Sequence, residues 1–222
     1  MRAMILAAGR GERMRPLTDH TPKPLLKAGG RALIEHTIDR LVAGGITEII
    51  VNTAHLGEQV ELYLGEGTRY GASIRYSMEC EALETGGGIF RALPLLGDEP
   101  FLVVNGDIAT DFDFGSLRER EIRLAHLVLV KNPEHHPLGD FGLEDGLARE
   151  GGDMRYTFCG IGVYRPRLFA DCVPGRFALA PLLRQAMALE QVGAELFPGF
   201  WMDIGTVDRL QAFDDYLTGG QS

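Results

Sequence analysis

Cysteine is scarce in this chain, which has only Cys80, Cys159 and Cys172 among its 222 residues. The three are far apart in the sequence, odd in number, and contain no CxxC pairing. Disulfide-dense frameworks are typical of small secreted domains, whereas intracellular thiols stay reduced. We therefore expect reduced, mostly buried thiols in a cytoplasmic protein.

Long apolar runs and excess positive charge are also missing. No stretch approaches the roughly 18 apolar residues of a membrane span, and the apolar run at 3–8 is shorter than a signal-peptide core of about 7–15 residues. The 22 basic residues are outnumbered by 31 acidic ones, for a net charge of −9. Nucleic-acid-binding domains usually carry a basic stripe. We therefore expect no membrane and no nucleic-acid partner, and any phosphate binding must be local.

The sequence does contain a regular alternation of apolar strands and amphipathic helices. Ile34, Ile38 and Leu41, for example, recur at helical spacing before the Gly44-Gly45 stop. The expected strands are 3–8, 48–53, 73–77, 100–107 and 124–130, and the expected helices are 33–45, 57–67 and 86–96. Strands that alternate with helices predict an α/β fold, with a mostly parallel sheet covered on both faces.

The pattern changes after residue 130. Residues 131–165 hold short segments separated by turn residues, so we expect a small irregular or antiparallel insertion there. Helical spacing returns at 178–190 and at 207–217. The prediction is one α/β domain over 1–222, with a Rossmann-like, open, mostly parallel mixed sheet.

The loop after the first strand, LAAGRGERMRPLT (Leu6–Thr18), combines two glycines with three arginines. Ligands bind at this edge of open α/β sheets, where glycine lets backbone amides approach an anion and arginine grips phosphate oxygens. A solvated turn is the alternative. A Walker A loop is excluded because Glu12 follows Gly11, and a dinucleotide fingerprint because Met14 occupies its third glycine position.

Four further positions suggest the same chemistry. Lys23 lies between two prolines, which stiffen the backbone and hold the ammonium in place. The glycines of ETGGGI (84–89) form either a flexible loop or a backbone surface that lies flat against a ligand. Asp107 ends a buried strand, where it would suit a hard divalent cation or cap the next segment. Asp203 is a second metal-binding carboxylate or a helix cap.

Together these motifs resemble the sugar-1-phosphate nucleotidyltransferases, or nucleotide-diphosphate-sugar pyrophosphorylases. The family signature is a strand followed by GxGxRxxPxT and then by a lysine next to proline, as found here between residues 3 and 24. NGD, FCGIGVY and WMDIGT follow in the order and spacing of the family. The resemblance thus covers nearly the whole chain.

The resemblance implies a role for each matching residue. Arg13 is the catalytic arginine, Lys23 contacts the reacting phosphates, and Asp107 and Asp203 bind Mg²⁺. Glu84 replaces a glutamine that is common in thymidylyl-specific and many uridylyl-specific members. The implied nucleotide-binding residues are Ala7, Ala8, Gly9, Gly11, Glu84, Gly88 and Asn105, and the implied sugar-binding residues are Gly142, Phe158 and Gly160.

Within the family, LETGGGI, HHPLGDFGL and the short length resemble the branch that uses N-acetylmuramic acid α-1-phosphate. This implies transfer of UMP from UTP to that sugar 1-phosphate in bacterial peptidoglycan recycling. Transfer of thymidylyl, uridylyl or guanylyl groups to glucose or mannose 1-phosphate is the alternative. No hexapeptide repeat follows, so we expect no C-terminal left-handed β-helix domain, and we expect a monomer. The candidates for contacting the lactyl carboxylate are Lys131, His135, His136 and Arg155.

The implied reaction fits the residues without a His or Ser triad. The sugar phosphate oxygen that attacks the α-phosphorus is already ionised and needs no general base, while cations offset the repulsion between two polyanions. A nucleotide-sugar-binding regulator without turnover is one alternative, which a pyrophosphate-release assay would distinguish. A dinucleotide-dependent oxidoreductase is the other, and the missing fingerprint disfavours it.

Overall fold

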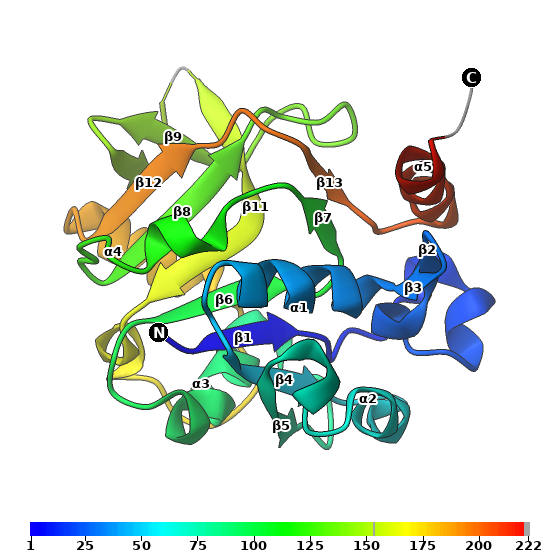
Figure 1. Ribbon diagram of the computed structural model, residues 1–222. Helices are drawn as coiled ribbons and strands as arrows, with labels where there is room; N and C mark the ends of the chain where they lie inside the picture. Colours follow the sequence, from blue (N-terminus) through cyan, green and yellow to red (C-terminus); the bar gives the residue numbers. More distant parts are fainter. Residues whose placement is uncertain (153, 220–222) are drawn as a thin grey trace.

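A nine-stranded mixed sheet forms the centre of the computed structural model, which describes residues 1–152 and 154–219 (Figure 1). In spatial order the strands are β5 (Ser73–Met78), β4 (Glu48–Thr53), β1 (Ala3–Leu6), β6 (Phe101–Asn105), β11 (Arg155–Tyr164), β8 (Ala125–Val130), β12 (Val192–Leu196), β10 (Leu147–Arg149) and β9 (Phe141–Glu144). The first four strands in this order are mutually parallel, and β8 is parallel to β12.

Helices cover both faces of this sheet, as the alternating sequence predicts. Ile5 packs in one core with side chains of α1 (Leu33–Ala43) and α2 (Gly57–Leu64). Met4, its neighbour on β1, packs in the opposite core with α3 (Glu84–Leu96) and α4 (Ala180–Ala188). Successive side chains of a strand point to opposite faces, so a strand buried on both faces is apolar throughout. The predicted α/β fold class is confirmed.

The segment at 131–165 is organised differently from the expectation. Its last part is β11, a ten-residue strand in the middle of the sheet, antiparallel to both β6 and β8. Antiparallel pairing depends on a return of the chain that no local pattern encodes, which explains why the sequence suggested only short segments here. The irregular part is limited to the loop after β8 and the β9–β10 hairpin, in which β10 pairs with β12 and β9 pairs with the start of β11.

A small ribbon beside the sheet carries the C-terminal part of the chain. β7 (Ile108–Thr110) pairs with β13 (Trp201–Asp203), and α5 (Val207–Thr218) follows. A third core joins this ribbon to α5 and to the hairpin of β2 (Lys27–Ala28) and β3 (Arg31–Ala32). The ribbon thereby brings the residues after β13 next to the end of β6.

None of the helices in the described part of the chain combines the length and apolar character needed to cross a bilayer.

Candidate functional site

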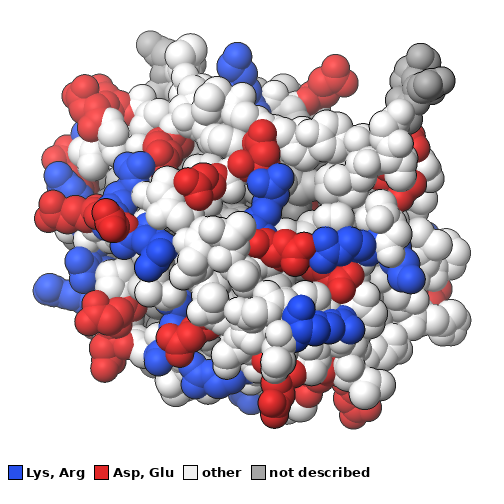
Figure 2. Space-filling model, viewed as in Figure 1, with Lys and Arg blue, Asp and Glu red and all other residues white. Residues whose placement is uncertain are grey.

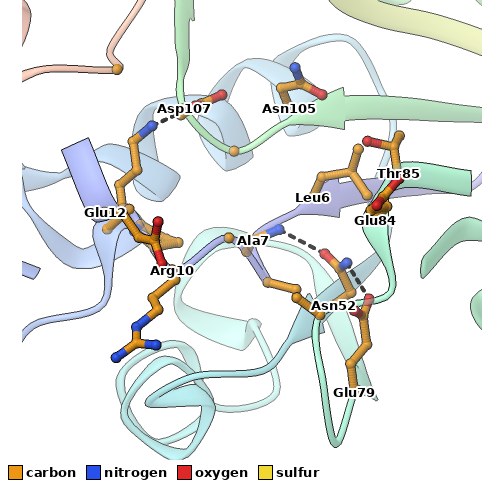
Figure 3. Close-up of a pocket in the computed structure, with 18 of the residues that line it drawn as sticks. Leu6, Ala7, Arg10, Glu12, Asn52, Glu79, Glu84, Thr85, Asn105 and Asp107 are labelled. Carbon is orange, nitrogen blue, oxygen red and sulfur yellow. Dashed lines mark hydrogen bonds and ion pairs between the residues drawn. The ribbon is translucent and has the colours of Figure 1, made fainter. Parts of the chain in front are cut away.

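A cavity of about 520 Å³ opens at the carboxyl ends of β1, β4 and β6 (Figure 3). This is the edge at which open α/β sheets bind ligands, and the volume suits a small-molecule site. Its polar lining includes Asn52, Glu79 and Thr85, which were not predicted. The predicted site residues that line it are Ala7, Ala8, Gly9, Gly11, Arg13, Lys23, Glu84, Asn105 and Asp107.

The glycine-rich loop after β1 turns tightly where it enters this cavity. Gly11 has φ of +67°, which favours glycine, and a Cβ atom there would lie 2.9 Å from Thr18 Cγ2. The Thr18 hydroxyl donates a hydrogen bond to the Gly11 carbonyl at 2.9 Å. The loop is more ordered than its sequence suggested, because it contains three short 3₁₀ turns at Glu12–Met14, Leu17–Asp19 and Lys23–Leu25.

Lys23 and Asp107 form an ion pair on one side of the cavity. The Lys23 ammonium donates to Asp107 Oδ2 at 2.5 Å, and the lysine is 9% exposed. Asp107 follows β6 and precedes a strand, so it does not cap a helix. The structure therefore favours the expectation of a fixed lysine over that of a surface lysine in a turn.

Asp203 is not among the residues that line the cavity and lies at the end of β13, on the β7–β13 ribbon. It pairs with Ile108, the residue after Asp107, and the Ile204 amide donates to the Asp107 carbonyl at 2.6 Å. The Asp203 carboxylate accepts from Arg209 and lies 2.9 Å from His135 Nε2. Thr206, not Asp203, caps α5, so the alternative role of Asp203 as a cap is wrong.

The two aspartates fit a magnesium ion that is shared with a substrate. No cluster of three or more His, Cys, Asp or Glu side chains in the described part of the chain is arranged to hold a metal by itself. Mg²⁺, however, usually binds through one or two carboxylates together with waters and substrate phosphates. Asp107 and Asp203 offer two hard oxygen ligands on adjoining backbone segments.

The glycines of ETGGGI pack against protein rather than forming a flat ligand surface. A Cβ atom on Gly86 would lie 2.5 Å from the Phe177 ring, and one on Gly87 would lie 2.3 Å from the Gly175 carbonyl. The Phe177 carbonyl accepts from the Gly87 amide at 3.0 Å. Neither alternative, a flexible loop or a backbone surface that lies flat against a ligand, describes these glycines, because they lie in α3 and let the 173–177 loop approach its buried start.

The side chains of Asn52 and Glu79, on the opposite side of the cavity, were not predicted from the sequence to belong to the site. The Ala7 amide donates to Asn52 Oδ1 at 2.7 Å, and Asn52 Nδ2 donates to Glu79 Oε1 at 2.6 Å (Figure 3). The Leu83 amide donates to Glu79 Oε2 at 2.9 Å. Gly88 is not in the lining but packs behind it, since its Cβ would lie 2.7 Å from Glu79 Oε1. Asn52 is a polar residue near the end of the predicted strand 48–53, and this position could have indicated a role at the ligand edge of the sheet.

Glu84, at the start of α3, has an unusual backbone for a non-glycine residue. Its φ is +60°, and its carboxylate accepts from Arg176 at 2.9 Å. Both side chains of this pair are largely solvent-exposed. Arg176 comes from the same loop that packs on Gly86 and Gly87, so this loop fixes the segment that leads from β5 into α3.

None of the predicted sugar-binding residues is in the lining of the cavity, although Gly160 packs against Asn105, which does line it. Gly160 has φ of +82°, and a Cβ atom there would lie 2.5 Å from Asn105 Nδ2. The Phe158 amide donates to Asp140 Oδ2 at 2.8 Å. Gly142, in β9, packs so closely on the Gly151 carbonyl that a Cβ would lie 2.2 Å from it.

Of the four residues predicted as candidates for contacting the lactyl carboxylate, one contacts a predicted metal-binding aspartate. His135 touches Asp203, whereas His136 Nε2 lies 3.1 Å from Asp140 Oδ1. The Arg155 guanidinium donates to the Asp140 backbone carbonyl at 2.5 Å. Lys131 is exposed.

Charge in the cavity is not strongly positive. The lining holds the cations Arg10, Arg13 and Lys23, but also four carboxylates, those of Glu12, Glu79, Glu84 and Asp107. On the outer face shown in Figure 2, acidic and basic side chains are interspersed, and that face shows no continuous basic stripe. A polyanion would thus meet a few placed cations rather than a basic surface.

Comparison with known proteins assigns the chain to a family. Residues 2–145 match the model of the nucleotidyl transferase family. The chain belongs to the nucleotidyl transferase family. It is 52% identical over 221 residues to an N-acetylmuramate alpha-1-phosphate uridylyltransferase of Neisseria meningitidis serogroup B, with 95% of this chain and 96% of the relative covered.

Other nucleotidyl transferases agree with this assignment. A protein of Caulobacter vibrioides with the same name as the Neisseria relative is 36% identical, with 91% of each chain covered. A structure described as a glucose-1-phosphate thymidylyltransferase from Bacillus anthracis, in complex with a sucrose, superposes with a TM-score of 0.87. It covers 98% of this chain and 95% of its own at 23% identity, a similarity that supports the fold alone.

Proposed function

We propose that this protein transfers UMP from UTP to N-acetylmuramic acid α-1-phosphate, giving a UDP-sugar and pyrophosphate. The observation that carries the proposal is the convergence of the glycine-rich loop, Arg13, Lys23 and Asp107 on one cavity at the carboxyl edge of the sheet. The 52% identity to a uridylyltransferase over nearly the full length of both proteins supports the choice of nucleotide and sugar.

The residues of the cavity would act mainly by placing charge. Backbone amides of the loop and the Arg13 guanidinium bind the triphosphate, and the Lys23 ammonium stabilises negative charge that develops at the α-phosphorus. Lys23 is held by Asp107 within a buried environment, where a fixed cation is worth more than in water. The attacking phosphate oxygen needs no base because it is already ionised.

Asp107 and Asp203 would hold Mg²⁺, which supplies positive charge to the phosphates when it is bound. The need for it follows from the lining, in which Asp107, Glu12, Glu79 and Glu84 outnumber the three cations. Without added positive charge, a triphosphate and a sugar phosphate would repel both each other and these carboxylates.

Asn52 and Glu79 would form the end of the cavity that receives the nucleotide base, beside Glu84. Gly160, which packs against Asn105, would mark the sugar side, with Phe158 two residues before it on β11. Gly142 would belong to the same side through the pairing of β9 with β11. We propose a cytoplasmic location, since the three free cysteines suit a reducing compartment. We also propose that the enzyme is a monomer.

A substrate matrix tests the proposal. UTP, dTTP, CTP and GTP are each combined with N-acetylmuramic acid, N-acetylglucosamine, glucose and mannose 1-phosphates, and pyrophosphate release is measured with Mg²⁺. We expect the highest kcat/KM for UTP with the muramic acid phosphate. A preference for glucose or mannose 1-phosphate would overturn the sugar assignment, and no release with any pair would overturn the enzyme assignment.

A further inference from the structure

Two arginines from distant parts of the chain meet at the edge of the cavity. Gly205 lines the cavity, and a Cβ atom built on it would lie 2.7 Å from Arg209 Nη2 and 2.9 Å from Arg13 Nη2. Arg13 comes from the loop after β1, whereas Arg209 lies in the first turn of α5. Two guanidinium groups thus approach one small space that only glycine leaves open.

The charges of these two arginines are only partly balanced within the protein. Asp203 accepts from Arg209, but Arg13 has no carboxylate within 4.0 Å in the part of the chain that the structure describes. His135 adds a third nitrogen-bearing group, 2.8 Å from Arg209 Nη1. Like charges held this close favour the binding of an anion between them.

Arg209 is not in the cavity lining, and its neighbours lead toward the proposed sugar-binding residues. His135 belongs to the loop between β8 and β9, which continues to Asp140, and Asp140 in turn holds the Phe158 amide of β11. Asn52 and Glu79, at the other side of the cavity, have their own hydrogen-bond network. Arg209 is therefore separated from the proposed base end and faces the space next to Arg13.

We propose that Arg209 binds an anionic group of the sugar substrate, with its guanidinium shared between that anion and Asp203. The group is either the 1-phosphate, which every sugar 1-phosphate carries, or the carboxylate of the lactyl ether, which is specific to muramic acid. This inference deepens the proposed function and rests on it. A guanidinium suits both groups because its fork matches their paired oxygens.

Steady-state kinetics of Arg209→Gln and Arg209→Lys, with each substrate varied in turn, test the role. We expect Arg209→Gln to lower kcat/KM for N-acetylmuramic acid α-1-phosphate about ten- to hundredfold, as for loss of a charge-assisted hydrogen bond. The KM for UTP should change little. Arg209→Lys should recover only part of the loss, since an ammonium lacks the fork. The matched control is Arg184→Gln, which removes an exposed arginine of α4 that pairs with Glu150. This variant should behave as the wild type.

N-acetylglucosamine 1-phosphate, which lacks the lactyl carboxylate, distinguishes the two sources of the anion. An equal loss with both sugar phosphates identifies the 1-phosphate as the partner, and a loss confined to the muramic acid compound identifies the carboxylate. Because Arg209 also contacts Asp203, the activity is measured across a Mg²⁺ titration. A higher Mg²⁺ requirement with an unchanged KM for the sugar phosphate would overturn the proposal.

The other outcomes are equally informative. A rise confined to the KM for UTP would assign Arg209 to the triphosphate and overturn the proposal. If wild-type protein prefers another sugar phosphate, the proposed function fails in its sugar assignment, and the Arg209 variants are then compared on that preferred substrate. Calorimetric binding of the sugar phosphate to Arg209→Gln, with melting curves to establish folding, gives a readout that does not depend on turnover.

Discussion

The Lys23 ammonium lies 2.5 Å from Asp107 Oδ2, joining the loop after β1 to the end of β6 across 84 positions of sequence. Pro22 and Pro24 flank the lysine, and its side chain is only 10% exposed. A buried charge that loses its partner is costly, so each residue of this pair holds the other in place. The cavity thus contains a cation whose position is fixed before any substrate binds.

Replacing this lysine should affect turnover more than substrate binding. We expect Lys23→Met to lower kcat about 10²- to 10³-fold, as for the loss of one donor aimed at transition-state charge, with a smaller change in the KM for UTP. The exposed Lys27→Met, four residues along, is the control and should retain activity. A change in KM alone would make Lys23 a binding residue only.

The two aspartates should be needed for activity rather than for folding. Asp107→Asn and Asp203→Asn each remove a charged metal ligand at nearly constant size, so pyrophosphate release should fall by two orders of magnitude or more, on the order of 3 kcal/mol in the barrier. Asp98→Asn, at an exposed position away from the cavity, is the matched control. Near-normal activity of either variant at saturating Mg²⁺ would contradict a two-aspartate site.

Alanine should destabilise the start of α3, although it normally favours helices over glycine. The Gly87 position leaves no room for a Cβ atom beside the Gly175 carbonyl. We expect Gly87→Ala to lower the free energy of unfolding by about 1–3 kcal/mol, the usual cost of overpacking, despite a helix-propensity gain of about 1 kcal/mol. Gly151→Ala is the control for urea denaturation, because a Cβ atom built on Gly151 would have no neighbouring atom within 4 Å outside the adjoining residues. A stabilised Gly87→Ala variant would show that the 173–177 loop moves freely.

The three cysteines should differ in reactivity, and the expectation of mostly buried thiols fails for Cys80, which is exposed. Burial raises the pKa of Cys159 to about 12 and also raises the pKa of Cys172, so little of either thiol is ionised at pH 8. We expect one thiol to react rapidly with a chromogenic disulfide in the native protein, and all three thiols to react after unfolding. The rapid phase should vanish in Cys80→Ser, and its persistence there would contradict this assignment.

Much of the fold could be predicted because the first half of the chain encodes it locally. The strands β1, β4 and β6 are short, mostly apolar runs, β5 alternates between apolar and polar residues, and α1 carries Ile34, Ile38 and Leu41 on one face. The central placement of β11 could not be predicted, since it depends on pairing with β6 and β8 from distant segments. β12 was also missed, because VGAEL lacks a clear alternation.

The candidate site, like the fold, could be predicted where the signal is local in the sequence, but not where it depends on tertiary contacts. Glycine, arginine and lysine spacing located the loop after β1, and Asp107 was found because a polar residue ended an apolar strand. Arg209 escaped notice because an arginine in the first turn of a helix looks like a solvated residue, and its contacts with Asp203 and His135 arise only in the tertiary structure. Glu79 was missed for a similar reason, since its partner Asn52 lies 27 residues away.

Nucleotidyl transfer at this cavity is tested most directly by following two radiolabels from UTP. With N-acetylmuramic acid α-1-phosphate and Mg²⁺, label at the α-phosphorus should appear in the UDP-sugar, and label at the γ-phosphorus should appear only in pyrophosphate. Both transfers should slow by the same factor in Lys23→Met. Appearance of the γ-label in the sugar product, or absence of a labelled UDP-sugar, would contradict uridylyl transfer.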